Sequence, residues 1–160
     1  MNNTPKLLAC EEATWLAAMM DAEGCFSVGR GGCSRTPTIV FIIGMYNNPI
    51  ILKCREITGC GTIRSYVRRG NRMWYWQIAP KYGKPIITQV IPHLIEKKEQ
   101  AEIFIRWPVW GTGSHGIPEY ILKEREDLVS RIKYLNHSEH QHQPNYEYAP
   151  NKYCTMQATL

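Results

Sequence analysis

The sequence contains no long hydrophobic run. Its longest nearly unbroken apolar stretch, Ile39 to Met45, is far too short to cross a bilayer, so we expect no membrane partner. Residues 1–6 show no basic stretch followed by an apolar run, and we expect no secretory signal. Hydrophobic residues still make up 44% of the 160 residues, and aromatic residues 11%. That is enough for the core of one domain and excludes disorder of the whole chain.

The six cysteines include no CxxC pair. Cys25 with Cys33, or Cys54 with Cys60, could be proposed as pairs of zinc ligands, but neither spacing matches a common metal site. We therefore expect reduced thiols in a cytosol-like compartment.

Acidic residues are scarce in the middle of the chain. Residues 53–84 hold eight Lys or Arg and one acid, Glu56, which gives a local charge of +7. Since the whole chain carries +5, the remainder sums to −2. One basic stretch in near-neutral surroundings indicates a polyanionic partner, most often nucleic acid. The alternative is a solvated basic face without a partner.

Hydrophobic periodicity and turn residues predict an α+β fold. Two hairpins, the second with a turn at residues 69–71, form a four-stranded antiparallel sheet with helices gathered on one face. We expect a single domain over residues 1–135 and a polar, extended or mobile tail over residues 136–160. The expected order is α-β-β-α-β-β-α-α plus a final helix, at residues 11–22, 25–30, 38–45, 47–57, 62–67, 73–78, 85–91, 96–107 and 118–135.

The first predicted helix ends with two acids, Asp21 and Glu23. The helix dipole disfavours negative charge there by about 0.3–1 kcal/mol each. Positions two apart on a helix point about 200° away from each other, so the two carboxylates cannot converge on one site. We expect one to pair elsewhere and the other to bind a cation. Ala18 and Ala22 share a face that a second backbone could approach closely. Two solvated acids are the alternative interpretation.

Residues 16–24, Leu-Ala-Ala-Met-Met-Asp-Ala-Glu-Gly, resemble the LAGLIDADG motif of homing endonucleases. Residues 42–51, the glycine turn at 59–63 and the segment at 92–101, which contains Lys-Lys-Glu-Gln-Ala, are similar to later parts of that family. The resemblance covers about residues 11–107. It implies the αββαββα fold, in which a saddle-shaped sheet binds DNA and the helices lie on the other face.

The resemblance also implies a divalent-metal site. Glu23 matches the ligand, where the family usually has Asp, and the backbone carbonyl of Ala22 would be a second ligand. Lys97 aligns with a basic residue near the scissile phosphate, although it could also be an ordinary exposed lysine. Met45 matches a position where some relatives place Gln, a role that Asn47 could take over. The expected cofactor is Mg²⁺, with Mn²⁺ substituting for it and Ca²⁺ binding without supporting cleavage.

The chain contains only one such motif. Since metal-assisted displacement at phosphorus needs carboxylates on both the attacking and the leaving side, one Glu23 per chain points to a homodimer. Its DNA target would then be nearly palindromic. The candidate dimer-interface residues are Trp15, Ala18, Asp21 and Ala22.

Alternation along the second hairpin suggests a DNA-reading surface. Arg64, Tyr66 and Arg68 share one face of the third strand, while Arg72, Trp74 and Trp76 share one face of the fourth. A tryptophan on a strand is more often part of the core. The candidate DNA-binding residues are Ser27, Arg30, Arg35, Arg64, Tyr66, Arg68, Arg69, Arg72, Trp74, Trp76, Lys81 and Lys84.

These features favour an intron-encoded homing endonuclease that makes a metal-dependent double-strand cut. An intron-splicing maturase or a non-cutting DNA-binding regulator with the same fold is the alternative. A purely structural domain would leave the basic strands and the helix-end acids unexplained. His137, His140 and His142 suggest an HNH nuclease or zinc site, but their polar surroundings favour an adventitious metal patch. We expect the cytoplasm of a bacterium or of a phage-infected cell, with an organelle as the alternative.

Overall fold

Four antiparallel strands form one sheet in the order β1-β2-β4-β3. This computed structural model describes residues 3–31, 36–68, 70–110 and 116–141. The two outer pairs, β1 with β2 and β3 with β4, are hairpins, and β2 joins them through β4. The strands are β1 (Gly24–Gly31), β2 (Thr36–Met45), β3 (Thr62–Arg68) and β4 (Asn71–Ile78).

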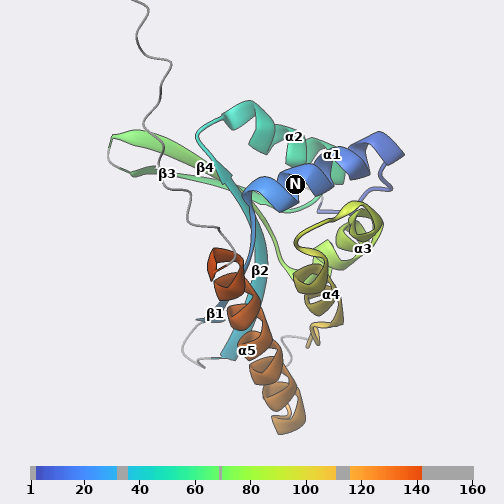
Figure 1. Ribbon diagram of the computed structural model, residues 1–160, viewed down its shortest axis with the longest axis vertical. Coiled ribbons are helices and arrows are strands. Elements are labelled where there is room, and N and C mark those ends of the chain that lie inside the picture. The colour runs from blue at the N-terminus through green and yellow to red at the C-terminus, as the bar shows by residue number, and fades with distance from the viewer. Residues whose placement is uncertain (1–2, 32–35, 69, 111–115, 142–160) are drawn as a thin grey trace, which may run out of the picture.

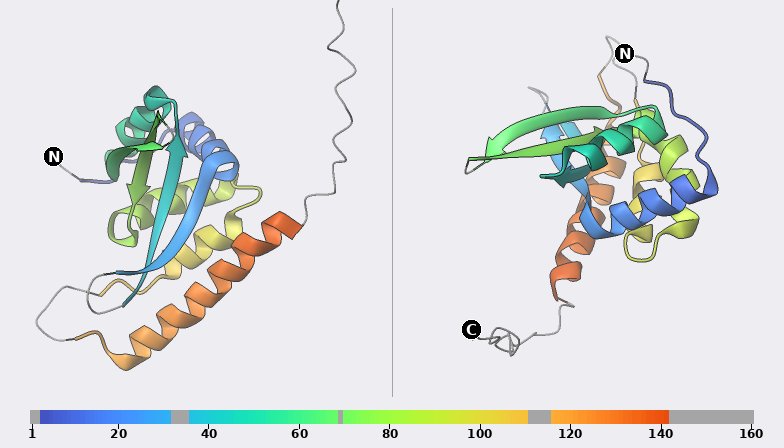
Figure 2. Two further views of the ribbon diagram at one scale, coloured as in Figure 1. Left: turned by 90° about the vertical axis from the view of Figure 1, so that its left-hand side faces the viewer. Right: turned by 90° about the horizontal axis from the view of Figure 1, so that it is seen from above.

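The helices cover one face of this sheet and leave the other face open (Figures 1 and 2). The left panel of Figure 2 looks onto the open face, with the sheet in front of α1, α3 and α4. The expected α+β architecture and element order are therefore confirmed. The helices are α1 (Cys10–Glu23), α2 (Asn48–Thr58), α3 (Pro80–Val90), the short 3-10 helix η1 (Ile91–His93), α4 (Lys98–Arg106) and α5 (Glu119–Gln141).

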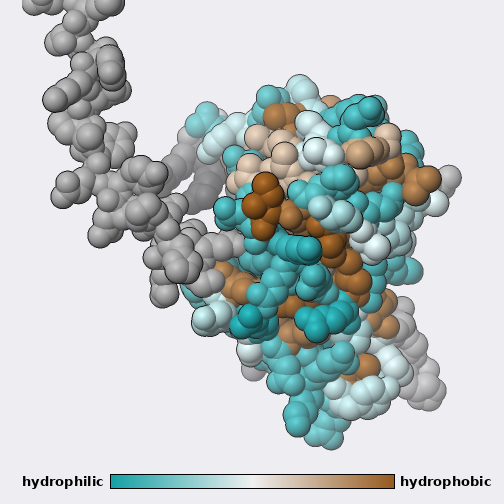
Figure 3. All heavy atoms as spheres, turned by 45° about the vertical axis from the view of Figure 1, so that its right-hand side comes forward, coloured by the Kyte–Doolittle hydropathy of each residue, from teal (hydrophilic) through white to brown (hydrophobic). Residues whose placement is uncertain are grey.

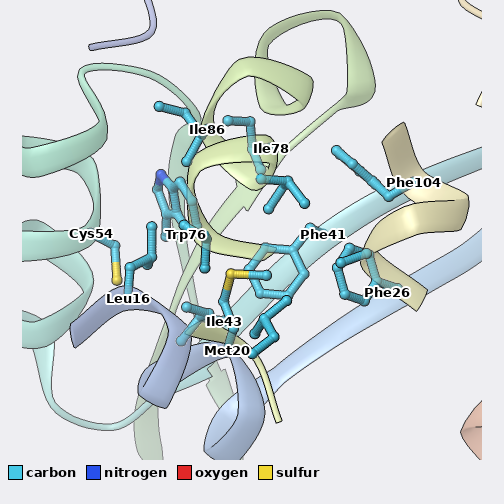
Figure 4. Packing of buried hydrophobic residues seen from close by; sticks show 14 of the residues in the cluster. Leu16, Met20, Phe26, Phe41, Ile43, Cys54, Trp76, Ile78, Ile86 and Phe104 are labelled. Atoms are coloured by element: carbon cyan, nitrogen blue, oxygen red, sulfur yellow. The ribbon is translucent and has the colours of Figure 1, made fainter. Parts of the chain in front are cut away.

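The core lies between the sheet and the helices (Figure 4). Alternate residues of β2 are buried because successive side chains of a strand point to opposite faces. Phe41 lies at the centre, with its ring centroid 4.7 Å from that of Phe26 and 6.1 Å from that of Trp76. Leu16 and Met20 of α1 pack against the same cluster, which fixes α1 over the sheet.

Two element boundaries differ from the sequence-based prediction by more than two residues. Helix α3 begins at Pro80 rather than residue 85, because a proline at the first helical position lacks only an N–H that has no helical acceptor there. Helix α5 continues past residue 135 to Gln141, so the predicted start of the tail falls inside this helix. Asn136 belongs to its packed part, since its side-chain amide donates to the carbonyl of Phe26 at 3.1 Å.

The helical side carries some exposed apolar residues. On the face that Figure 3 shows, brown hydrophobic residues reach the surface between teal hydrophilic ones. Leu52 and Ile95 are among the exposed apolar side chains. Within the described segments, no helix has both the length and the apolar composition required to traverse a membrane.

Candidate nucleic-acid interface and active site

The C-terminal end of α1 directs its two acids to different places. The Asp21 carboxylate accepts hydrogen bonds from the backbone N–H groups of Ile95 (2.8 Å) and Lys97 (3.0 Å). Glu23 is exposed. The expectation that one acid pairs elsewhere therefore holds for Asp21, and its partner is the turn before α4 in the same chain.

Lys97 lies beside the end of α1 although the two are far apart in the sequence. Its ammonium group donates to the backbone carbonyl of Asp21 at 2.5 Å. Lys97 is the N-cap residue of α4, and its side chain is half-buried. The fold thus brings a cation to the last turn of α1, in which Glu23 is the final residue.

Helix α1 ends sharply because Gly24 has no side chain. A Cβ atom on Gly24 would lie 2.4 Å from the carbonyl oxygen of Met20 and 2.6 Å from the ring of Phe41. The chain therefore passes from helix into β1 within one residue, and Glu23 stands at the junction of α1 and the sheet. The last carbonyl groups of a helix have no intrahelical donors and carry partial negative charge.

The donor atoms at this junction suit a hard divalent cation. The exposed Glu23 carboxylate and the backbone carbonyl of Ala22 are oxygen donors, which Mg²⁺ prefers over nitrogen or sulfur. Throughout the described ranges, no group of three or more His, Cys, Asp or Glu is placed to hold a metal. The described part of one chain therefore offers two oxygen donors at this junction, one from Glu23 and one from the carbonyl of Ala22.

Met45 is the last residue of β2, and Asn47 follows this strand, at the end of the sheet where α1 enters β1. Met45 pairs with Trp74 and is half-buried against the core. Asn47 is exposed at the N-cap position of α2 and makes no capping hydrogen bond. Their catalytic roles stay predictions.

Strand register decides which side chains reach the open face. Arg64 pairs with Tyr75 and Tyr66 pairs with Met73, so these four residues share the open face. Ser27 of β1 belongs to the same face through its pairing with Val40. The backbone of Arg68 continues this row, but its side chain lies outside the described residues, as do Arg35 and Arg69 entirely.

The prediction that Trp76 and Trp74 bind DNA is wrong. Trp76 is fully buried, and its indole N–H donates to the carbonyl of Cys60 at 2.9 Å. Trp74 is half-buried and packs against the core on the helical side. Arg72 shares this side, because it donates to the Ser65 hydroxyl at 3.1 Å and lies 5.9 Å from the centre of the Trp74 ring.

The register of the β3–β4 hairpin explains this error. Arg68 pairs with Asn71, so residues 69 and 70 connect the strands. The sequence pattern predicts a longer turn over residues 69–71. A shift of one residue exchanges the two faces of a strand. Tyr75 and Gln77 therefore lie on the open face, where the sequence pattern predicts Arg72, Trp74 and Trp76.

A stacked pair of tyrosines, Tyr66 and Tyr75, dominates this part of the open face. Their ring centroids are 4.8 Å apart, the ring planes differ by 11°, and their hydroxyl groups are hydrogen-bonded. Gly44 of β2 pairs with Tyr75, and a Cβ atom there would lie 2.6 Å from the tyrosine ring. Sequence reasoning missed Tyr75, although a glycine inside an apolar strand was a signal that another group lies close to it.

The remaining basic candidates lie away from the open face. Arg30 points to the helical side, where it forms a 2.8 Å ion pair with Glu126 of α5, which contradicts its predicted role on the DNA-facing side. Lys84 is half-buried in the helical layer, where burial lowers its pKa and Glu124 of α5 opposes that shift. Lys81 lies 5.2 Å from the centre of the Tyr82 ring. Contacts of Lys81 and Lys84 with phosphate stay predictions.

The histidine-rich segment forms no described metal site. His137 is exposed on α5, and the side chain of His140 and all of His142 lie outside the described residues. Among the described cysteines, Cys10, Cys25, Cys54 and Cys60 are free thiols.

Comparison of folds identifies the architecture. The chain matches no protein-family model and no curated protein in sequence searches. It does match two DNA complexes of the homing endonuclease I-CvuI, with TM-scores of 0.62 and 0.63, 20% identity, and coverage of 78% of this chain and 82% of that one. The chain has the LAGLIDADG homing-endonuclease fold. The predicted fold is thus confirmed, with α1 as its motif helix.

Two further structures with the homing-endonuclease fold differ in length. The archaeal intron-encoded homing endonuclease I-Vdi141I, solved with DNA, matches with a TM-score of 0.51 and 13% identity, over 75% of this chain and 98% of its own. I-SmaMI matches with a TM-score of 0.51 and 16% identity, over 86% of this chain but only 46% of its own. The match therefore spans nearly all of the first of these proteins and less than half of the second.

Proposed function

We propose that this protein is a site-specific homing endonuclease that makes a metal-dependent double-strand cut in DNA. The observation that carries the proposal is the contact of the Lys97 ammonium group with the last turn of α1, where the exposed Glu23 also stands and the sheet begins. The open face next to this junction displays Arg64, Tyr66 and Tyr75. I-CvuI and I-Vdi141I, which share the fold, were solved in complex with DNA.

The residues at this junction and on the open face have three separate roles in the proposed reaction. Glu23 and the carbonyl of Ala22 would hold Mg²⁺, which when bound activates a water molecule and neutralises charge on the phosphate. Lys97 supplies a fixed positive charge that stabilises the negative charge developing on the phosphate oxygens. Arg64 and the tyrosine pair orient the duplex by contacts to phosphates and base edges.

We propose that the active form is a homodimer on a long, nearly palindromic site. Each chain supplies a single exposed carboxylate at the end of α1, since that of Asp21 is held by the turn before α4, so a second copy is needed for a cut on each strand. Ala18 and Ala22 are exposed on α1, and Trp15 is half-buried beside them. Small exposed side chains allow two helices to approach closely.

Cleavage selection on a randomised duplex library, supplemented with intron-flanking sequences, tests the proposal. We expect cuts at one nearly palindromic site with Mg²⁺ or Mn²⁺, and binding without cutting with Ca²⁺. Glu23→Gln is expected to abolish cutting while target binding in Ca²⁺ survives. Glu102→Gln, the same change at an exposed position of α4, is the matched control and should cut normally.

The other outcomes separate the alternatives. Enrichment of DNA without any cut under Mg²⁺ or Mn²⁺ would indicate a non-cutting regulator. Salt-sensitive binding of structured RNA that is indifferent to Glu23→Gln would indicate a splicing maturase. A lack of any enrichment would contradict the role assigned to the open face.

A further inference from the structure

Asp21 accepts two hydrogen bonds from Lys97. The backbone N–H of Lys97 donates to the Asp21 carboxylate, and the Lys97 ammonium donates to the Asp21 backbone carbonyl. A second donor, the N–H of Ile95, also reaches this carboxylate. Both the main chain and the side chain of Lys97 are therefore tied to the same residue of α1.

This arrangement accounts for an acid in an unfavourable place. A carboxylate at the C-terminal end of a helix meets the negative end of the dipole. The Asp21 carboxylate offsets that repulsion by accepting two charge-assisted hydrogen bonds from the turn before α4. The Lys97 ammonium compensates further, because it lies directly on a carbonyl at that helix end. The metal-ligand role is thus left to Glu23.

The turn before α4 has few other anchors. The Ile95 side chain is 87% exposed and Glu96 is also exposed, while Leu94 is the buried residue that precedes them. Lysine side chains are long and lose much rotamer freedom when they are fixed. The hydrogen bonds between Asp21 and this turn would therefore determine the position of the Lys97 backbone and the position of its ammonium group.

We propose that Asp21 is a positioning residue that holds the Lys97 ammonium at the end of α1, in the turn that ends with Glu23. The inference rests on the proposed endonuclease function for its chemical consequence. A cation fixed in advance stabilises charge in the transition state without reorganisation at the moment of reaction. Asp21 acts through Lys97 and contacts neither the metal nor the DNA.

A first measurement examines the contact itself and requires no activity. Asp21→Asn keeps the shape of the side chain but places an amide N–H₂ against backbone donors. Asp127→Asn, at an exposed position of α5, is the matched control. We expect exchange of the Ile95 and Lys97 amide protons to accelerate about tenfold or more in Asp21→Asn, and the NMR signal of the Lys97 ammonium to shift. The control should leave both unchanged.

A second measurement tests the consequence for the reaction. In single-turnover cleavage at saturating target DNA, Asp21→Asn and Lys97→Met should each slow the cutting step. The double variant should be no slower than Lys97→Met alone, because both changes remove the same positioned charge. The Kd for target DNA in Ca²⁺ should stay unchanged in all three. If Asp21→Asn fails to fold, Asp21→Glu, which keeps the charge on a longer arm, replaces it with the same expected order.

The outcomes distinguish this inference from the proposed function. Unchanged amide exchange in Asp21→Asn would overturn the inference, and so would losses of cleavage rate that add fully in the double variant. If the wild-type protein cuts no DNA, the endonuclease proposal fails, and the exchange measurement alone decides whether Asp21 positions Lys97.

Discussion

Burial of individual thiols makes the protein sensitive to alkaline pH. Cys54 is fully buried in the core, and this burial raises the pKa of its thiol from 9.0 to about 12. Burial also raises the pKa of Cys60. The unfolded chain ionises these thiols at lower pH than the folded chain does. Ionisation of Cys54 therefore leaves the free energy of unfolding unchanged below pH 9 and lowers it as the pH rises from 9 toward 12.

Urea unfolding across alkaline pH measures this effect. For Cys54 alone, we expect the free energy of unfolding to fall above pH 9 with a slope approaching about 1.4 kcal/mol per pH unit. Cys54→Ala should remove part of this slope and leave the rest to Cys60. The control, Cys10→Ala, changes an exposed thiol and should keep the full slope. An identical slope in Cys54→Ala would refute the assignment.

The tyrosine pair on the open face makes a second residue-scale prediction. Tyr75→Ala removes the ring that stacks on Tyr66 and packs against the backbone of Gly44. Contacts to base edges contribute about 1–3 kcal/mol each, so target binding should weaken by roughly 5- to 150-fold. Fluorescence anisotropy in Ca²⁺ measures this change. Tyr120→Ala, at an exposed tyrosine of α5, should bind as the wild type does. Equal affinities of the two variants for DNA would show that Tyr75 is not part of the DNA interface.

At the scale of elements, the segment that precedes α1 joins two helices. The Gln89 side chain of α3 accepts from the N–H of Leu8 at 2.8 Å and donates to the carbonyl of Lys6 at 3.2 Å. The N–H of Lys6 in turn donates to the carbonyl of Thr58 at the end of α2. Residues 3–8 thus hold α2 and α3 together on the side of the molecule away from the sheet's open face.

Removal of this connection should loosen the segment locally. Gln89→Ala deletes both hydrogen bonds to residues 6 and 8, which should lower the free energy of unfolding by about 1–2 kcal/mol. Hydrogen exchange at Leu8 should accelerate more than exchange in α4 or β2. Thr88→Ala, at the neighbouring exposed position of α3, serves as the control. Equal protection of Leu8 in Gln89→Ala and in the wild type would contradict the connection.

At the scale of the whole molecule, assembly decides whether the site is complete. Ala18→Glu places a charge on the exposed small-residue face of α1. Two such charges facing each other would repel across a close helix pair, so we expect a folded monomer that no longer cuts DNA. Sedimentation velocity and circular dichroism measure assembly and fold. Ser130→Glu, at an exposed position of α5, should leave assembly unchanged. A dimeric Ala18→Glu protein would exclude this face of α1 as the interface.

Local patterns in the sequence are sufficient to predict the order of the elements and the end of α1. Periods of two and of about 3.6 residues, together with Gly24 and Pro49, are local signals that need no partner. The motif at residues 16–24 similarly predicted the fold that the structural comparison confirmed. Helix geometry alone also predicts that the carboxylates of Asp21 and Glu23 point away from each other.

Which side chains contact each other depends on how the strands and helices pack together. One residue in a hairpin turn exchanged the faces of β4 and placed Trp76 in the core, although its sequence pattern fitted the open face equally well. The contact of Lys97 with α1 depends on the packing of α3, η1 and α4, which no local pattern contains. Register and long-range contacts arise from the packing of the whole chain, so they appear only when the sheet and its helices come together.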